Sequence, residues 1–264
     1  MPLPMSTGEA KSRPLTEKER FYLQAKALWD KRWKNTPATF SPMRQSRSRQ
    51  HFQLCTSFLT HMKLEPGARV IDLGCGQGDL LKALDNKGYT LEGLDISSIP
   101  LHSLSSIKTY QEGLPETSLP SAEYDLVICT EVIGELPPIY HRLLFSECAR
   151  LLKTDGMLLF SSALDIDSIS PLTQLHTFFA SEFDLLDHHL HYHMWQLRLK
   201  RLLKSPIFRY FTKPLLGFVE QNAWFLRSLE KLCQQFKGEE GISQVTYVGR
   251  KRNPFKRKSR LTKG

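Results

Sequence analysis

Cysteines are few in this sequence, and their spacing argues against two kinds of stabilising site. The 264 residues include five cysteines, an odd number, and no Cys-x-x-Cys pair. A disulfide framework is built from an even set and a thiolate zinc site from closely spaced pairs, so neither is expected. We expect reduced thiols packed as small hydrophobic side chains at Cys55, Cys75, Cys129, Cys148 and Cys233.

Long apolar runs are absent as well. No stretch approaches the roughly 18 to 20 apolar residues that a membrane-spanning helix needs, and residues 1–13 contain no apolar segment of signal-peptide length. Hydrophobic residues still make up 41% of the chain, which is enough for a substantial core. The sequence therefore predicts a cytoplasmic protein that folds as one unit with additions.

Acidic residues are scarce at both ends of the chain. The net charge is +7 over residues 1–50, −11 over residues 51–190 and +13 over residues 191–264. An acidic middle flanked by basic arms is typical of a protein that meets an anionic partner, such as a membrane surface or RNA. Basic arms also occur simply for solubility, so both interpretations stay open.

What the sequence does contain is a glycine-rich turn between two apolar runs. The first run ends in an acid and three alternating glycines: Asp72, Gly74, Gly76 and Gly78. This pattern predicts a buried strand that breaks sharply and then enters a helix. Glycine lacks a Cβ, which permits a tight turn and lets the main chain approach a ligand closely. A second apolar run ends at Asp95, where a nucleoside ribose would lie across the neighbouring strand end.

Together, the Asp-x-Gly-x-Gly-x-Gly turn and Asp95 resemble motifs one and two of the class I S-adenosylmethionine-dependent methyltransferases. The spacing differs from the dinucleotide fingerprint Gly-x-Gly-x-x-Gly, which disfavours a nicotinamide or flavin site. Residues 123–133 resemble the family's fourth strand, and residues 150–160 resemble its next helix, turn and fifth strand, with Asp155 where glycine is commoner. The match covers roughly residues 65–165 and is nearest to the type-11 group, which includes quinone-ring and other small-molecule methyltransferases.

The resemblance implies an α/β fold with a doubly wound, mostly parallel seven-stranded sheet, the Rossmann-like methyltransferase fold, and a helical insertion before the last strand. The expected parts are a partly disordered basic arm and lid (1–48), the cofactor-binding core (49–192), a basic helical insertion (193–241), the last core strand (242–250) and a disordered basic tail (251–264). The aromatic residues of the lid, Phe21, Trp29 and Trp33, are expected to fold over the cofactor or to serve as ordinary docking contacts.

Sequence periodicity places the individual elements. Helices are expected at 17–34, 49–62, 78–87, 138–152 and 172–180, with a short one within 97–106. Strands are expected at 69–73, 89–94, 107–111, 124–129, 157–162 and 183–192, and a last antiparallel strand at 244–250 beside the sixth.

S-adenosylmethionine is the implied co-substrate. The cofactor-binding residues carried over from the resemblance are Asp72, Gly74, Cys75, Gly76, Gly78, Asp95, Ile96, Glu112, Leu114, Cys129, Thr130 and Glu131. The glycines would pass beneath the methionine part, and Asp72 would fix the turn or reach the ammonium group through water. Asp95 would accept hydrogen bonds from both ribose hydroxyls, with Ile96 beside the adenine.

The catalytic residue is not identified by the sequence. Methyl transfer from a sulfonium is an in-line displacement, and much of its acceleration comes from alignment, so a base is not always needed. Many type-11 members have a Glu-His pair where this chain has Gly134-Glu135. The candidates for a base are therefore Glu131, Glu135, His141 or a residue of the insertion.

Two further patterns leave alternatives open. His189, His191 and His193 share one face of a predicted strand, but no acid or cysteine stands at ligand spacing, so no metal site is expected. Residues 194–204 form a basic amphipathic helix that suits either a cap over the substrate pocket or contact with an anionic membrane surface, which would make the protein peripheral to the membrane.

The leading hypothesis is a methyltransferase that acts on a small-molecule or lipid-like acceptor of quinone or phenol type. One alternative is an RNA methyltransferase that uses the basic arms. Another is a binding module that keeps the fold without catalysis, which the Gly134-Glu135 departure favours.

Overall fold

The computed structural model describes residues 14–35, 46–164, 170–191 and 242–253. The insertion predicted at 193–241, the N-terminal 13 residues and nearly all of the predicted tail lie outside the described residues. Within the described ranges, no helix combines the length and apolar composition that crossing a membrane requires.

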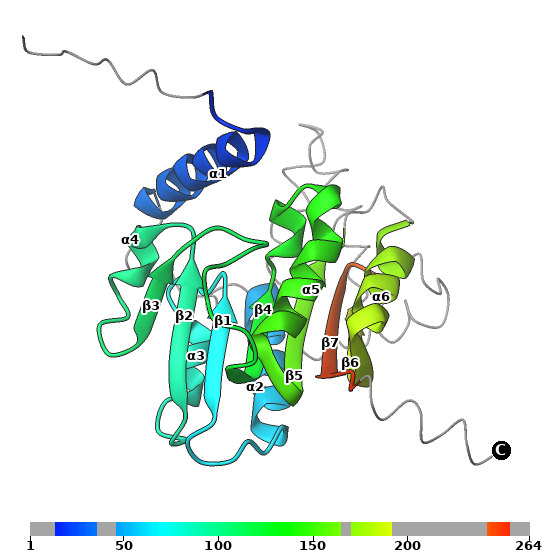
Figure 1. Ribbon diagram of the computed structural model, residues 1–264. Helices are drawn as coiled ribbons and strands as arrows, with labels where there is room; N and C mark the ends of the chain where they lie inside the picture. The colour runs from blue at the N-terminus through cyan, green and yellow to red at the C-terminus, as the bar shows by residue number, and fades with distance from the viewer. Residues whose placement is uncertain (1–13, 36–45, 165–169, 192–241, 254–264) are drawn as a thin grey trace, which may run out of the picture.

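A seven-stranded sheet forms the centre of the described protein, in the order β3-β2-β1-β4-β5-β7-β6 (Figure 1). Its strands are β1 (Arg69–Leu73), β2 (Thr90–Asp95), β3 (Lys108–Gln111), β4 (Tyr124–Thr130), β5 (Leu152–Ala163), β6 (Phe183–His191) and β7 (Gln244–Lys251). The pairs among β1 to β5 are parallel, and β7 runs antiparallel to both β5 and β6. This confirms the predicted mostly parallel α/β sheet with an antiparallel last strand.

Helices cover both faces of this sheet. They are α1 (Glu17–Lys34), α2 (Ser46–His61), α3 (Asp79–Leu84), α4 (Ser98–Leu101), α5 (His141–Leu151) and α6 (Ser170–Glu182). Alternate strand residues divide between the faces: Val127 belongs to the apolar cluster that contains residues of α5 and α6, whereas Leu126 and Ile128 belong to the cluster that contains residues of α2 and α3. This period of two is what a strand buried on both faces requires.

Several element boundaries differ from the sequence prediction, and three of these differences have a clear basis in the structure. Helix α3 ends at Leu84 rather than near residue 87, because Asn86 and Gly88 adopt left-handed backbone conformations (φ 66° and 74°) that end a helix. Strand β5 begins at Leu152 rather than residue 157, since Leu152 already pairs with Tyr124. Strand β7 continues to Lys251, one residue into the segment predicted as tail.

A register irregularity within β5 coincides with an unusual residue in the sequence. Asp155 stands where related sequences more often have glycine, and its φ is 61°. Glycine adopts this left-handed conformation without strain, and aspartate is among the few other residues that tolerate it.

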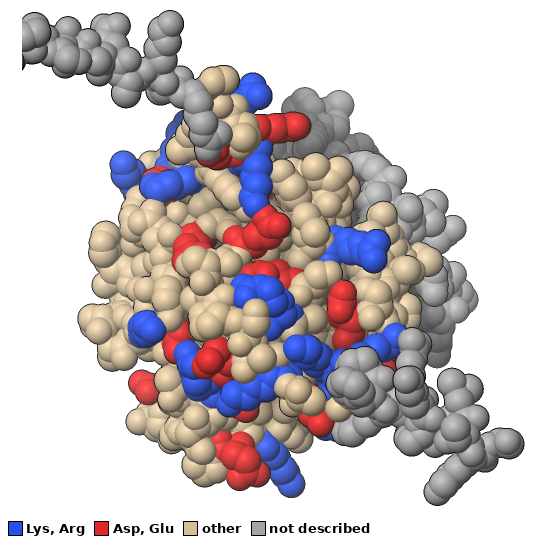
Figure 2. Space-filling model, in the orientation of Figure 1, with Lys and Arg blue, Asp and Glu red and all other residues tan. Residues whose placement is uncertain are grey.

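Charged side chains of both signs are interspersed on the face shown in Figure 2. Several form ion pairs, including Lys153 with Asp125 (2.8 Å between Nζ and Oδ2) and Arg252 with Asp184 (3.0 Å between Nε and Oδ1). The strongly basic segments of the sequence lie mainly outside the described residues, so the expected contacts with a membrane surface or RNA remain predictions.

Candidate active site

A hollow of about 810 Å³, its open mouth included, lies among the carboxyl ends of β1, β2 and β4 and helix α1. Its walls are formed by Phe21, Ala25, Trp29, Trp33, Gly74, Gly76, Leu94, Asp95, Ile96, Glu112, Leu114, Thr130, Glu131, Val132, Glu135 and Leu136. Mostly apolar walls with a few polar groups are typical of small-molecule sites. Ligands of open α/β sheets bind at this edge.

The glycine turn forms the floor of the hollow. Gly74 has φ 78°, and a Cβ added there would lie 2.4 Å from Cγ2 of Val132. Gly76 has φ 52°, and a Cβ there would lie 3.0 Å from Cζ2 of Trp33. Both backbone conformations favour glycine, and at Gly74 the close approach of Val132 also leaves no space for a Cβ.

Asp95 ends β2 beside this turn. The register pairs Leu73 with Leu94, so the turn begins next to Asp95. The Asp95 carboxylate accepts hydrogen bonds from the backbone N–H of Gly76 (3.0 Å) and of Ser97 (2.9 Å). Burial raises the pKa of Asp95, and these two donors oppose that shift. An ionised carboxylate has about four acceptor positions, so positions remain for hydroxyl groups of a ligand.

Asp72 is the last residue but one of β1 and is 3% exposed. Burial, with contributions from the charges of Asp95 and Asp79, raises the pKa of Asp72 to about 8. Asp72 does not line the hollow. It is a buried carboxyl whose ionisation is costly in the folded protein.

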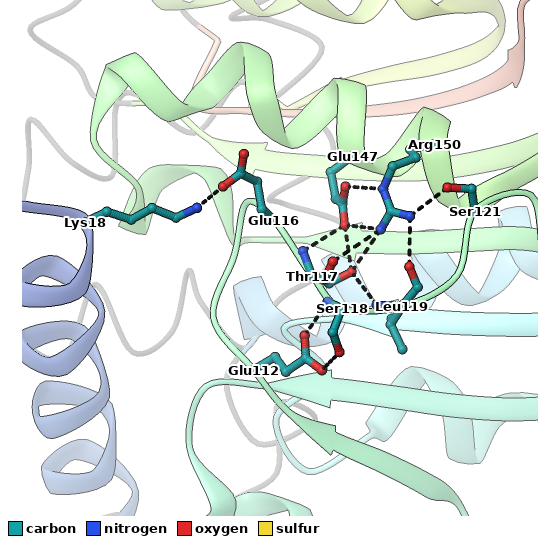
Figure 3. Close-up of polar contacts among 9 residues, drawn as sticks. All are labelled: Lys18, Glu112, Glu116, Thr117, Ser118, Leu119, Ser121, Glu147 and Arg150. Atoms are coloured by element: carbon teal, nitrogen blue, oxygen red, sulfur yellow. Dashed lines mark hydrogen bonds and ion pairs between the residues drawn. The ribbon is translucent and has the colours of Figure 1, made fainter. Parts of the chain in front are cut away.

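The loop after β3 forms one side wall and is fixed from two directions (Figure 3). Within it, the backbone N–H of Ser118 donates to the Glu112 carboxylate (2.7 Å), which keeps Glu112 at the wall. From α1, Lys18 forms an ion pair with Glu116. The loop therefore connects α1 to the wall that carries Glu112 and Leu114.

From α5, an ion pair holds the same loop (Figure 3). Glu147 is 6% exposed and accepts hydrogen bonds from Thr117 N (2.9 Å) and Arg150 Nε (2.7 Å). Arg150 also donates to Leu119 O and Ser121 Oγ, both at 2.8 Å. Arg150 and Thr117 lower the pKa of Glu147 against the effect of burial. Because Arg150 contacts both carboxylate oxygens of Glu147, through Nε and Nη2, the pair imposes a definite loop geometry.

Helix α1 closes the hollow from above. Thr16 and Glu19 form a capping box at its start, and the half-buried side chains on one face include Phe21, Trp29 and Trp33, which line the hollow. Helix α1 has no fully buried residue. It is held by specific contacts, among them a hydrogen bond from Ser97 Oγ to Asp30 Oδ1 (2.6 Å).

Replacing Asp30 by alanine should weaken binding of S-adenosylhomocysteine about tenfold. Ser97 donates a hydrogen bond from its hydroxyl to Asp30 of α1 and another from its backbone N–H to Asp95, so it links α1 to Asp95. A hydrogen bond to a charged group contributes about 1.5 to 3 kcal/mol. Calorimetric titration would measure the change in Kd. Lys31→Ala, an exposed position on the same helix, is the control, and equal Kd values for both variants would contradict the prediction.

The structure brings together many of the residues predicted from the sequence. Those that line the hollow are Gly74, Gly76, Asp95, Ile96, Glu112, Leu114, Thr130, Glu131 and Glu135; those that do not are Asp72, Cys75, Gly78, Cys129 and His141. Gly78 has φ 70° and precedes α3 as its N-cap. His141 lies at the start of α5, where its Nε2 is 3.0 Å from the backbone oxygen of Leu136.

The two cysteines expected to line the pocket face the protein core instead. Cys129 lies in the apolar cluster with Cys148 of α5, because alternation along β4 directs it to that face. Cys75 packs in a cluster with Leu81 and Leu104. Burial raises the pKa of Cys75, and neither thiol is activated. The walls that the sequence did not indicate are Ala25, Leu94, Val132 and Leu136.

The histidines of β6 lie on the edge strand of the sheet, with the rings of His189 and His191 4.5 Å apart. His193 lies outside the described residues. Among the residues that the structure describes, no group of three or more His, Cys, Asp or Glu side chains could hold a metal ion.

The sheet order, the glycine turn and the acid at the next strand end define the Rossmann-like methyltransferase fold. A family model described as a methyltransferase domain matches residues 44–210. The chain therefore belongs to the methyltransferase-domain family, among the class I S-adenosylmethionine-dependent methyltransferases.

Curated relatives are similar at modest identity. A ubiquinone biosynthesis O-methyltransferase of Histophilus somni is 27% identical over 162 residues, which cover 55% of this chain and 62% of that protein. Proteins of the same name from Burkholderia thailandensis and Klebsiella pneumoniae are 32% and 33% identical over 37% and 36% of this chain, and 45% and 43% of their own lengths. The chain thus matches less than two thirds of each relative.

Solved structures share the fold at low identity. The N-methyltransferase NodS of Bradyrhizobium japonicum, in complex with S-adenosylhomocysteine, has a TM-score of 0.56 at 12% identity, over 88% of this chain and 99% of that one. The [4+2]-cyclase SpnF has a TM-score of 0.56 at 14% identity, over 89% and 96%. Since these two proteins are named for different reactions, the fold alone does not identify the chemistry.

Proposed function

We propose that this chain is an S-adenosylmethionine-dependent methyltransferase that methylates a hydroxyl group of a small quinone- or phenol-type acceptor. The main support is the convergence of Gly74, Gly76 and Asp95 on one hollow that an aromatic helix closes. The names of the curated relatives support the acceptor class.

The residues present fit such a cofactor. Gly74 and Gly76 bring main chain to the edge of the hollow, where the methionine part would lie, and Asp95 has acceptor positions left for the ribose. The cofactor supplies an activated methyl group. The protein's part is to hold the acceptor oxygen in line with the methyl group and sulfur, while Trp29 and Trp33 exclude water from the hollow.

The acceptor side of the hollow suits an aromatic ring. Phe21, Trp29, Val132 and Leu136 provide apolar walls, and the carboxylates of Glu131 and Glu135 provide hydrogen-bond acceptors. A phenol or hydroquinone presents both an apolar ring and a hydroxyl donor. The segments that carry the RNA and membrane hypotheses lie mainly outside the described residues, so no specific observation favours either.

Two measurements test this proposal. Calorimetry should detect binding of S-adenosylhomocysteine, and purified protein with radiolabelled S-adenosylmethionine should transfer label to the lipid or small-molecule fraction of a cell extract. Label in the RNA or protein fraction would overturn the acceptor class. Absence of cofactor binding would overturn the enzymatic proposal, and binding without label in any fraction would favour a non-catalytic module.

A further inference from the structure

Glu131, immediately after β4, has an unusual backbone and an unusually well-held side chain. Its φ is 59°, a left-handed conformation that costs a non-glycine residue roughly 1 to 2 kcal/mol. Its side chain is 40% exposed and lines the hollow. Strained residues of this kind persist only where surrounding structure holds them, and they cluster at functional sites.

Three donors from two strands hold the carboxylate. Ser161 Oγ and Gln244 Nε2 donate to Glu131 Oε1 at 2.9 and 2.8 Å, and the backbone N–H of Ala163 donates to Oε2 at 3.2 Å. Ser161 is fully buried and Gln244 is 4% exposed. The orientation of Glu131 is therefore set by residues of β5 and β7.

A histidine of α2 lies beside these groups. His51 of α2 is 13% exposed, and its Nε2 lies 3.1 Å from Ser161 Oγ and 3.8 Å from Glu131 Oε1. Because the Ser161 hydroxyl donates its only proton to Glu131, the hydrogen-bond pattern assigns the donor role toward Ser161 to His51 Nε2. The chain of donors runs from His51 through Ser161 to Glu131.

We propose that Glu131 is the catalytic residue that takes the acceptor's proton, and that Ser161, Gln244 and His51 are its positioning residues. This inference rests on the proposed function. An ionised carboxylate has about four acceptor positions, and three donors leave one for the acceptor hydroxyl. In the transfer, an O–CH₃ bond forms as the S–CH₃ bond breaks, the hydroxyl proton passes to Glu131 and then to water, and the thioether product leaves uncharged.

The test compares turnover with cofactor affinity in Glu131→Gln, Glu131→Asp, His51→Gln, Ser161→Ala and the double variant Glu131→Gln/His51→Gln. The probe acceptor is a catechol that carries a short prenyl chain. His61→Ala, at an exposed position on α2, is the matched control. Thermal unfolding and S-adenosylhomocysteine binding show which variants remain folded, and Glu131→Asp keeps the charge if Glu131→Gln does not fold.

Glu131→Gln should lower kcat about 100-fold or more with the S-adenosylhomocysteine Kd within about twofold. His51→Gln and Ser161→Ala should lower kcat about tenfold without changing the KM for S-adenosylmethionine. The effects of mutations on kcat do not add for residues that act as a unit. The double variant should therefore be no slower than Glu131→Gln.

Several results would overturn the inference. Unchanged kcat in Glu131→Gln would contradict its catalytic role. If the double variant lost kcat by the product of the two single-variant factors, the positioning role of His51 would be contradicted. If the parent bound S-adenosylhomocysteine but methylated no hydroxylated aromatic, the Glu131 assignment would fall with the acceptor class. Failure of the parent to bind S-adenosylhomocysteine would instead overturn the proposed function itself.

Discussion

Asp95→Asn should raise the Kd for S-adenosylhomocysteine by about 100-fold or more. The carboxylate already fixes the turn through Gly76 and Ser97 and is expected to accept both ribose hydroxyls. Each hydrogen bond to a charged group contributes about 1.5 to 3 kcal/mol, and 1.4 kcal/mol corresponds to a tenfold change in Kd. The measurement is calorimetric titration of the purified variant.

A matched control separates this effect from a general loss of surface charge. Asp187 on β6 is exposed, so Asp187→Asn removes the same charge far from the hollow and should leave the Kd unchanged. A Kd for Asp95→Asn within about threefold of the parent would contradict the assigned ribose contact.

Asp72→Asn should stabilise the ligand-free protein at pH 8. The folded-state pKa of Asp72 is raised to about 8, against about 3.9 in an unfolded chain. Between these values the folded state holds a proton that the unfolded state releases, so the stability of the parent falls as pH rises from about 4 to about 8. The asparagine variant has no such proton and should gain on the order of 3 to 5 kcal/mol in free energy of unfolding at pH 8.

Urea denaturation at pH 4.5 and pH 8 measures this difference. The gain should be small at the lower pH, and Asp85→Asn, an exposed control, should show no gain at either. The cofactor's cationic groups favour the ionised form of Asp72, so the parent should bind S-adenosylmethionine more tightly at pH 8 than at pH 6, and the variant should not. Equal stability of parent and variant at pH 8 would refute the role of burial at this position.

Local patterns predicted the parts of the site that are continuous in sequence. The glycine turn and the acid after the second strand are encoded within about 25 residues, and the backbone demands at Gly74 and Gly76 leave few alternative residues. The predicted β1 and the structural one coincide at Arg69–Leu73.

Side-chain direction was less well predicted where packing decides it. Cys75 and Cys129 lie near the hollow in sequence, but strand alternation and core packing turn both thiols inward. Conversely, Val132 and Leu136 line the hollow because they flank the short 3-10 helix Ile133–Glu135 after β4. That segment carries no distinct sequence signal.

The sequence by itself determined the sheet class, the cofactor motif and the family, because each depends on short-range backbone preferences and a fixed motif spacing. Only the tertiary structure decided which residues surround Glu131. His51 and Gln244 stand 110 residues from Ser161 and 113 residues from Glu131, respectively. Their meeting depends on α2 packing against the sheet and on β7 inserting between β5 and β6, and no local pattern encodes contacts over such separations.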